Sequence, residues 1–322
     1  MKFAVVGTNF ISDSFMDGIN QIKEAQVVAV CSGSRKSAED FSKKHNIPNV
    51  FDNFESLIES DVMDAVYLAV PNSLHYQMSM ECLKRGIPTY TEKPFATNFR
   101  DAKKMFECAQ EKNVYIHDGF VPVYTKNIQI VKSELNSIGK IRQVVFSFGK
   151  YSSRYDQYLQ GLNPTTFRND LCNGSLMDLG IYPIGAAIYL FGMPNKVIAN
   201  GISLETKVDG CGSCILSYED FEVIIIHSKI SNTKIISEIQ GEKGIIQIGM
   251  ISTMNNISID KGGKCLNIND NTNPFVYQIK EFIANVNNKK IESKIFNHQT
   301  SLDIISILDE CRKQMNITYP ND

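Results

Sequence analysis

The sequence predicts an α/β protein with two domains, a doubly wound parallel sheet in residues 1–119 and an α+β domain with a largely antiparallel or mixed sheet in residues 120–322. Three observations lead to this prediction. A chain of 322 residues is comfortable for two domains and long for one. Short apolar runs alternate with amphipathic stretches in the first third. After Phe120 this rhythm gives way to longer β-rich segments.

The first third reads as strands joined by helices. Amphipathic stretches at 73–85 and 99–112 place their apolar residues on one helical face. Strand and helix alternation implies parallel strands with right-handed crossovers. The apolar runs of strand length cover residues 2–6, 27–31, 65–70, 87–91 and 114–117.

The remainder reads as a sheet with a few helices. Asn-rich and Gly-rich turns separate its later β-rich segments, which indicates hairpins rather than crossovers. The predicted strands are 141–148, 196–204, 211–218, 222–229, 235–240 and 244–248. The predicted helices are 126–135, 178–191, 276–286 and 302–315.

Composition and charge exclude several classes of protein. Lysine and arginine total 33 against 35 acidic residues, and a net charge of −2 provides no footprint for nucleic acid. No stretch approaches the roughly 20 apolar residues of a membrane-spanning helix. The amino terminus enters a strand-like run at once, which is not typical of a signal peptide. We therefore expect a cytoplasmic protein that acts on a small molecule and binds neither nucleic acid nor a membrane.

Eight cysteines are scattered along the chain, and Cys211 and Cys214 form a lone CxxC pair. A zinc site of this type needs a second pair of ligands, which the sequence does not offer. We therefore predict no metal site, and strand cysteines that stay reduced in a reducing compartment.

A candidate phosphate loop follows the first strand and opens the first helix. In a dinucleotide site, glycines allow a tight turn and a close approach to the pyrophosphate, and the helix amino terminus attracts its charge. Only the first glycine position holds glycine here, at Gly7; we expect Asn9 to adopt a left-handed conformation and Ser12 to allow close packing. The alternative is an ordinary strand-to-helix turn. The candidate cofactor contacts are Gly7, Thr8, Asn9, Phe10 and Ile11.

The end of the second strand bears on the choice of cofactor. An acid at this place binds the ribose hydroxyls of NAD, but no acid occurs before Glu39. Ser32, Ser34 and Arg35 offer hydroxyl donors and a guanidinium fork, which suit the 2′-phosphate of NADP. The sequence therefore favours NADP over NAD. The alternative is a solvated helix start capped by Ser34.

Three further segments carry a resemblance to a known family. One follows the predicted strand at 65–70, one follows the strand at 87–91, and one opens the predicted helix at 178–191. Together they closely resemble the Gfo/Idh/MocA oxidoreductases, and the resemblance spans both predicted domains. The segments are Pro71-Asn72-Ser73-Leu74-His75, Glu92-Lys93-Pro94 and Asn173-Gly174-Ser175-Leu176-Met177-Asp178-Leu179-Gly180-Ile181-Tyr182-Pro183.

The resemblance implies a Rossmann domain followed by a domain with a large, open, mostly antiparallel sheet, which in this family often forms a dimer interface. We therefore expect a homodimer or a higher homo-oligomer. It implies a catalytic lysine, an acid and a proton-transferring residue at Lys93, Asp178 and Tyr182, and often a cis bond before Pro94. It also implies cofactor contacts from Pro71, Asn72, His75, Glu92 and Lys93.

The expected chemistry is hydride transfer between nicotinamide and a carbon that bears a hydroxyl, which needs a base in one direction and an acid in the other. A phenol with an ordinary pKa of about 10 needs a cation beside it to act as a base at neutral pH. Our hypothesis is that Tyr182 is the acid/base and Lys93 its electrostatic partner, although the two could exchange roles. Asp178, four residues before Tyr182, shares its helix face and orients the substrate or the pair.

Several of these residues have structural alternatives. Asn72 could cap the helix that begins at Ser73, and His75 could be a packed first-turn histidine. The sequence also departs from the family pattern. Asn173-Gly174-Ser175 replaces three glycines, Tyr182 replaces the histidine of inositol-type members, and Asp118-Gly119 replaces Glu-Ala.

The segment Tyr151-Ser152-Ser153-Arg154-Tyr155 is rich in hydroxyls and aromatic rings, which suit a sugar ring, and the alternative is an ordinary polar strand end. We expect Tyr151, Arg154, Arg168 and Asp178 to contact the substrate. The predicted function is an NAD(P)-dependent dehydrogenase or reductase of a sugar, polyol or cyclic diol. Two alternatives remain: a glycoside-processing enzyme that uses bound NAD, or a nucleotide-binding sensor without turnover.

Overall fold

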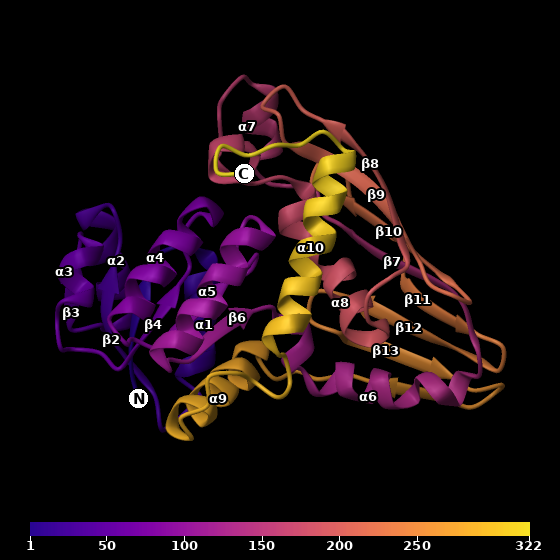
Figure 1. Cartoon of the computed structure of the whole chain (residues 1–322), viewed down its shortest axis with the longest axis horizontal. Coiled ribbons are helices and arrows are strands. Elements are labelled where there is room, and N and C mark those ends of the chain that lie inside the picture. The colour runs from indigo at the N-terminus through magenta and orange to yellow at the C-terminus, as the bar shows by residue number, and fades with distance from the viewer. The chain divides into compact units, whose positions relative to one another are not determined.

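The computed structural model describes all 322 residues and divides the chain into two compact units. The first unit comprises Met1–Gly119 and Thr272–His298, and the second comprises Phe120–Asn271 and Gln299–Asp322. Figure 1 shows the elements of both units along the chain.

The first unit is a parallel sheet of six strands in the order β3-β2-β1-β4-β5-β6. This order confirms the predicted doubly wound sheet, because the chain runs to one edge, returns to the centre and continues to the other edge. The strands are β1 (Lys2–Val6), β2 (Gln26–Cys31), β3 (Asn49–Phe51), β4 (Ala65–Leu68), β5 (Thr89–Glu92) and β6 (Ile116–Gly119). The helices that connect them are α1 (Phe10–Ile19), α2 (Arg35–His45), α3 (Phe54–Ile58), α4 (Asn72–Lys84) and α5 (Phe99–Lys112).

Polar caps set the ends of the longer helices. The side chains of Asn9, Ser34 and Asn98 accept hydrogen bonds from the first amides of α1, α2 and α5. The last two of these helices end at Asn46 and Asn113, both in the left-handed conformation that asparagine tolerates. These caps keep the connections short, so each strand end stands close to a helix start.

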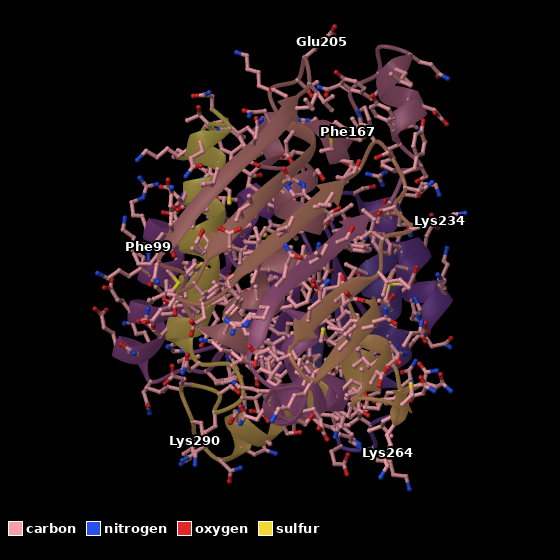
Figure 2. The ribbon with its side chains drawn as sticks, turned by 90° about the vertical axis from the view of Figure 1, so that its right-hand side faces the viewer. Phe99, Phe167, Glu205, Lys234, Lys264 and Lys290 are labelled. Carbon is pink, nitrogen blue, oxygen red and sulfur yellow. The ribbon has the colours of Figure 1, made fainter.

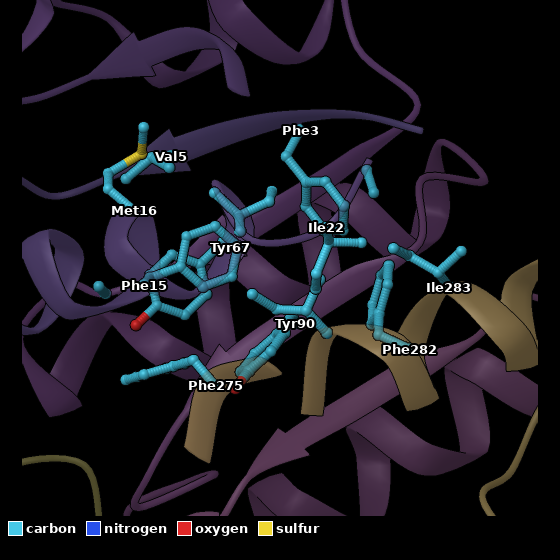
Figure 3. Close-up of a cluster of buried hydrophobic side chains, with 14 of the residues drawn as sticks. Phe3, Val5, Phe15, Met16, Ile22, Tyr67, Tyr90, Phe275, Phe282 and Ile283 are labelled. Carbon is cyan, nitrogen blue, oxygen red and sulfur yellow. The ribbon is translucent and has the colours of Figure 1, made fainter. Parts of the chain in front are cut away.

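Aromatic side chains fill the core on one face of this sheet (Figure 3). The ring of Tyr67 on β4 is fully buried and stacks on Phe15 of α1 at a centroid distance of 3.9 Å. The ring of Tyr90 on β5 forms a T-shaped pair with each of these rings, at centroid distances of 5.8 Å from Phe15 and 5.0 Å from Tyr67. The continuous apolar sequence of β4 predicted a sheet that is covered on both faces. All four residues of β4 are buried, which confirms this prediction.

The sequence analysis placed residues 272–298 in the second domain, and the structure corrects this. Helix α9 (Pro274–Asn287) belongs to the first unit, where Phe282 is fully buried at centroid distances of 5.3 Å from Phe3 and 5.4 Å from Tyr115. A β-carbon at Gly18 of α1 would lie 2.6 Å from the β-carbon of Phe275, so the two helices touch there. The apolar face of α9 completes a core that the first 119 residues leave open.

The second unit is built on a sheet of eight strands in the order β14-β13-β12-β11-β7-β10-β9-β8. Only β7 and β10 pair in parallel, so the sheet is mostly antiparallel, as expected. Its strands are β7 (Ile141–Gly149), β8 (Lys196–Ser203), β9 (Asp209–Ser217), β10 (Glu222–Ser228), β11 (Ser237–Gly241), β12 (Gly244–Met250), β13 (Asn255–Asp260) and β14 (Cys265–Ile268). The last two were not predicted, because an Asn-rich and Gly-rich sequence hides their short alternation.

The two faces of this sheet differ. Alternate residues such as Phe146, Ile225 and Leu216 are buried on the inner face, whereas Figure 2 shows the other face with no helix in front of its strands. The helices of the unit are α6 (Lys126–Glu134), α7 (Tyr155–Leu159), α8 (Ile181–Phe191) and α10 (His298–Gln314).

One helical stretch, Asn169–Phe191, is long and apolar enough to cross a membrane by length and composition alone. In the structure 78% of its apolar window is buried inside the protein. A core helix passes the same test, and the end of this stretch, α8, lies on the inner face of the sheet.

Replacing Phe282 by alanine tests the assignment of α9 to the first unit. Because the ring is fully buried, we expect a loss of about 3–5 kcal/mol in the free energy of unfolding, measured by urea denaturation. Ile295→Ala is the matched control within the same segment, since Ile295 is 38% exposed, and it should cost less than about 1 kcal/mol. Equal effects of the two substitutions would contradict the assignment.

Candidate active site

The predicted cofactor residues of the first unit lie at one edge of its sheet. The loops that follow β2, β1, β4 and β5 all leave the carboxyl ends of neighbouring parallel strands. The order of strands reverses between β1 and β4, and ligands of doubly wound sheets bind at such a switch point. The sequence segments after residues 6, 31, 68 and 92 are therefore brought together as expected.

Gly7 is the tightest point of this edge. It has φ +100°, and a β-carbon there would lie 2.1 Å from the carbonyl oxygen of Ala69. No other residue fits, because both the conformation and the space exclude a side chain. Ser12 is fully buried and its hydroxyl donates to the carbonyl of Gly7 at 2.8 Å. The close packing expected of Gly7 and Ser12 is present.

The expected conformation of Asn9 was wrong. Its backbone is extended, with φ −91° and ψ 179°, rather than left-handed. The side-chain oxygen accepts from the amides of Ile11 and Ser12 at 3.0 and 3.3 Å, and the side-chain nitrogen donates to Ala69 at 2.9 Å. Asn9 thus caps the helix by its side chain, which explains how the loop forms without a second glycine. The next residue, Phe10, is 79% exposed beside the loop.

The loop after β2 holds the residues expected to choose between NADP and NAD. The side-chain oxygen of Ser34 caps α2, so the capping alternative holds for this residue. Arg35 remains exposed, with its Nε 2.8 Å from Glu39 and one terminal nitrogen 3.9 Å from Asp52. The partner Asp52 follows β3, a three-residue strand outside the apolar runs of the sequence, and so it was missed.

The structure removes the structural alternative for Asn72. Helix α4 begins at Asn72 itself, its cap is Pro71, and no side chain caps it. Asn72 is half-buried at the carboxyl end of β4. Asn72 is therefore the first residue of α4 and not its cap.

In the Glu92-Lys93-Pro94 turn, Lys93 is partly exposed while the residues on either side of it are buried. Lys93 is the one residue between Thr89 and Asn98 that is not buried. Buried Glu92 accepts from the hydroxyl of Tyr67 at 2.8 Å and from the amide of Lys93 at 3.2 Å. The Lys93–Pro94 bond is cis, as the family resemblance implied.

The side chain of His75, which the family resemblance places near the cofactor, is buried beside the lysine turn. Its side chain is 1% exposed, with Nδ1 2.8 Å from the carbonyl of Pro94 and Nε2 3.0 Å from the carbonyl of Val70. Burial lowers the pKa of His75, so the ring is neutral and donates to one carbonyl at a time. This is the geometry of the packed-histidine alternative, and it ties α4 to the turn that carries Lys93.

Gly119 supports the lysine turn, a role that the sequence analysis did not assign when it noted Asp118-Gly119 as a departure from the family pattern. A β-carbon there would lie 2.8 Å from the carbonyl oxygen of Thr91 and 3.0 Å from the Cα of Glu92. The glycine of Asp118-Gly119 therefore allows β6 to approach the base of the lysine turn. This departure from the family pattern has a steric reason in the chain itself.

In the second unit, Asp178 and Tyr182 lie at the start of a buried helix. Residues Leu176–Gly180 form one turn of π-helix before α8, and Asp178 belongs to that turn. Between Gly174 and Ile188, Asp178 and Tyr182 are the two residues that are not buried. Their shared exposure fits the predicted common face, and π turns often occur at functional sites.

Aromatic packing holds the ring of Tyr182. Its centroid lies 5.5 Å from that of Phe148 and 6.0 Å from that of Phe120. A β-carbon at Gly185 would lie 2.3 Å from the Phe120 ring, so this glycine of α8 makes room for the aromatic pair. The sequence offered no periodic signal for Gly185, because it lies inside an apolar helix.

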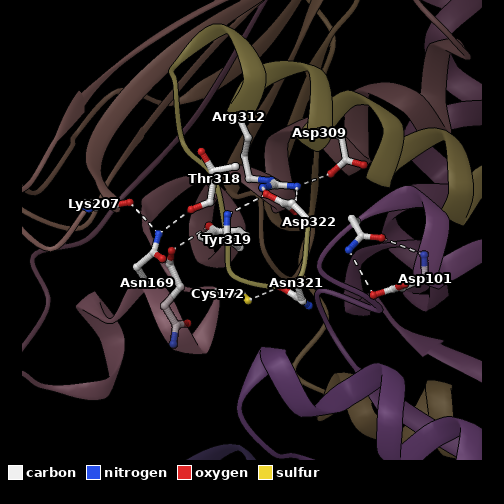
Figure 4. Close-up of polar contacts among 12 residues, drawn as sticks. Asp101, Asn169, Cys172, Lys207, Asp309, Arg312, Thr318, Tyr319, Asn321 and Asp322 are labelled. Atoms are coloured by element: carbon white, nitrogen blue, oxygen red, sulfur yellow. Dashed lines mark hydrogen bonds and ion pairs between the residues drawn. The ribbon is translucent and has the colours of Figure 1, made fainter.

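The segment before the π turn is tied to the carboxyl terminus of the chain (Figure 4). The hydroxyl of Tyr319 donates to the carbonyl of Asn173 at 2.9 Å, and the side chain of Asn169 donates to the carbonyl of Thr318 at 2.8 Å. Arg312 in turn pairs with Asp322 at 2.7 Å. These contacts fix the loop that contains Asn173-Gly174-Ser175.

The other predicted substrate residues lie between β7 and this loop. The hydroxyl of Tyr151 donates to Asp156 at 2.5 Å, and Arg154 hydrogen-bonds Thr165. Arg168 pairs with Asp170. Each of the three is therefore engaged locally on the surface of the second unit.

A buried cation next to Asp178 was also missed. The Nζ of Lys229, which follows β10, donates to the carboxylate of Asp178, although the lysine side chain is only 6% exposed. No group of three or more metal-ligating side chains lies together in the structure. Cys211 and Cys214 lie in β9 as free cysteines.

The fold and these two sets of residues define a dinucleotide-dependent oxidoreductase. The NAD-binding Rossmann-fold model of the oxidoreductase family matches residues 1–120, and the GFO/IDH/MocA C-terminal domain matches residues 131–247. The chain belongs to the Gfo/Idh/MocA family of NAD(P)-dependent oxidoreductases, which confirms the family inferred from its motifs.

Named relatives cover the whole chain. The scyllo-inositol 2-dehydrogenase (NADP(+)) IolU of Bacillus subtilis (strain 168) is 38% identical over 100% of this chain and 99% of the relative. A trans-1,2-dihydrobenzene-1,2-diol dehydrogenase of Xenopus tropicalis is 26% identical over 99% of each chain. The crystal structure of KijD10, a 3-ketoreductase from Actinomadura kijaniata in complex with NADP and TDP-benzene, has a TM-score of 0.87 at 21% identity, with 98% of each chain covered.

Proposed function

We propose that this enzyme transfers a hydride between NADP and a hydroxyl-bearing carbon of a polyol, sugar or cyclic diol. The observation that carries the proposal is that three polar side chains stay half-buried within otherwise buried segments: Lys93 on its turn, Asp178 on the π turn and Tyr182 at the start of α8. The inositol dehydrogenase and the dihydrodiol dehydrogenase among its relatives support the substrate class.

The residues of the first unit fit a dinucleotide. Gly7 has no room for a β-carbon beside the Ala69 carbonyl, so the chain turns tightly between β1 and α1, and the amino terminus of α1 would attract the charge of a pyrophosphate. Ser32, Ser34 and Arg35 would hold the 2′-phosphate of NADP. The NADP named for the inositol dehydrogenase supports this preference. Pro71, Asn72 and Lys93 would flank the nicotinamide end of the cofactor. Glu92 and His75 would hold the turn that carries Lys93, through their hydrogen bonds to Lys93 and Pro94.

The proton steps fall to the chain's own residues. The bound nicotinamide supplies or accepts the hydride. Tyr182 removes the hydroxyl proton of the alcohol during oxidation and returns it during reduction, while Lys93 stabilises the phenolate and binds the substrate hydroxyl. Asp178 accepts a hydrogen bond from a neighbouring hydroxyl of the substrate. Tyr151, Arg154 and Arg168 contribute aromatic faces and donors to the same ligand.

The outer face of the eight-stranded sheet supports a homodimer. Val145, Ile224, Ile215 and Ile198 stand opposite one another on β7, β10, β9 and β8, on the face that carries no helix. Such an apolar row is typical of an interface between copies of a chain. We also propose a cytoplasmic location, which the eight free cysteines support.

Lys93→Met and Tyr182→Phe test the proton transfer. Each should lower kcat by about 100-fold or more, because each removes a group that acts in the transition state. The measurement is the absorbance of reduced nicotinamide with a set of sugars, polyols and diols. Binding of NADP, measured by calorimetry, should stay nearly unchanged.

Tyr189→Phe is the matched control on the same helix, since its hydroxyl hydrogen-bonds Gln129 instead, and it should keep wild-type turnover. Unchanged turnover in both test variants would contradict the assignment. A wild-type enzyme that retains its cofactor and releases no reduced nicotinamide would favour the glycoside-processing alternative. Absence of any turnover would favour the sensor.

Arg35→Ala tests the cofactor preference. Loss of a charged hydrogen bond to phosphate costs about 1.5–3 kcal/mol, so the Kd for NADP should rise about tenfold or more while the Kd for NAD changes little. Calorimetry measures both. Lys36→Ala is the control, because Lys36 is exposed and pairs with Asp40 at 2.7 Å. Tighter binding of NAD than of NADP to the wild type would contradict the proposal.

Ile198→Asp combined with Ile215→Asp tests the dimer. Two carboxylates in the apolar row should convert a dimer into folded monomers, measured by sedimentation velocity and circular dichroism. Met193→Asp is the control, since Met193 is equally exposed but lies outside the sheet. A wild-type monomer, or a dimer that the double substitution leaves intact, would exclude this face as the interface.

A further inference from the structure

A buried lysine lies directly behind the carboxylate that the proposed mechanism uses. Lys229 is 5% exposed and follows β10. Its amide donates to the carbonyl of Gly210 at 2.9 Å, and its carbonyl accepts from the amide of Ser152 at 2.8 Å. The backbone of Lys229 is therefore held from both sides, by the start of β9 and by the segment after β7.

The ammonium of Lys229 faces two carboxylates of different exposure. It hydrogen-bonds Asp178, whose side chain is 35% exposed, and its charge also acts on Asp209, which is fully buried. Burial raises the pKa of Asp209 to about 6, against the opposing effects of the Leu176 amide and of Lys229. A lysine this deeply buried needs such partners, because a buried charge without a counter-ion is strongly destabilising.

The ammonium of Lys229 is the positive charge in this cluster, because the neighbouring histidine is neutral. His227, the nearest titratable residue on β10, is fully buried, and burial lowers its pKa to about 3, so its ring is neutral. Its Nδ1 lies 2.9 Å from the hydroxyl of Ser175. Asp209 accepts from the amide of Leu176 at 2.6 Å, which fixes the first residue of the π turn.

We propose that Lys229 is the positioning residue for Asp178. This inference rests on the proposed function, in which Asp178 binds a substrate hydroxyl. An aspartate side chain rotates freely at a half-exposed position, and an ion pair to a rigid, buried cation selects one rotamer. Lys229 thereby orients the Asp178 carboxylate on the helix face that also carries Tyr182.

The same lysine couples this carboxylate to the candidate substrate segment. The Ser152 amide binds the Lys229 carbonyl, and Tyr151 and Arg154 stand on either side of Ser152. A displacement of Lys229 would therefore move both the Asp178 carboxylate and residues 151–154. For this reason we expect Lys229 to affect the alignment of substrate more than the affinity for cofactor.

Kinetics of Lys229→Met tests the proposal. We expect kcat to fall roughly 10-fold to 100-fold with an unchanged Kd for NADP, since only the alignment of substrate is lost. Lys229→Arg keeps the charge but changes the geometry of the pair, so its kcat should lie between those of the wild type and the methionine variant. Lys140→Met is the control: Lys140 pairs with Asp220 at 2.6 Å on the exposed surface of the same unit, and its loss should leave kcat unchanged.

A double-mutant cycle separates positioning from a structural role. In an Asp178→Asn background, Lys229→Met should lower kcat by less than about twofold, because the residue it orients is already altered. Equal losses in both backgrounds, or wild-type kcat in the folded methionine variant, would overturn the proposal. If Lys229→Met does not fold, the arginine variant decides: a several-fold lower kcat at unchanged NADP affinity supports the proposal, and wild-type kcat overturns it. A wild type without turnover would instead contradict the proposed function.

Discussion

The close approach of two backbone segments at the centre of the parallel sheet governs the cofactor half of this enzyme. The loop after β1 presses against the end of β4 so tightly that a single β-carbon at Gly7 would overlap the carbonyl of Ala69. The side-chain nitrogen of Asn9 donates a hydrogen bond to the same Ala69 carbonyl. The placement of the first helix, and of the loops on either side of it, depends on this contact, because the strand order reverses here.

The sequence alone was sufficient for the elements with strong periodicity and for the motifs at strand ends. Alternating apolar and amphipathic stretches predicted the parallel sheet, and β-rich segments separated by turns predicted the second sheet. Helix α5 was predicted at its observed bounds. The lysine turn and the Asp178–Tyr182 pair were identified because their motifs carry a family pattern over short spacings. Features that depend on residues close together in the sequence could therefore be predicted from the sequence.

The features that were missed depend on contacts between distant parts of the chain. Nothing in the sequence of α9 says that Phe282 returns to a core formed by residues near the amino terminus. The hydrogen bonds of His75 could not be predicted, because one of them ends on the carbonyl of Pro94, 19 residues later in the sequence. Lys229 was missed because a lysine at a strand end reads as solvated, and only the folded sheet buries it behind an aspartate 51 residues earlier.

The return of α9 also constrains how this protein can be cut or recombined. The chain passes between its units three times, after Gly119, after Asn271 and after His298. A fragment that stops at Gly119 lacks α9, which covers Phe3 and Tyr90. It would therefore expose aromatic side chains to water and be prone to aggregate. Exchange of nucleotide-binding modules between homologous genes therefore has to carry two separate stretches of coding sequence, with the intervening sheet left in place.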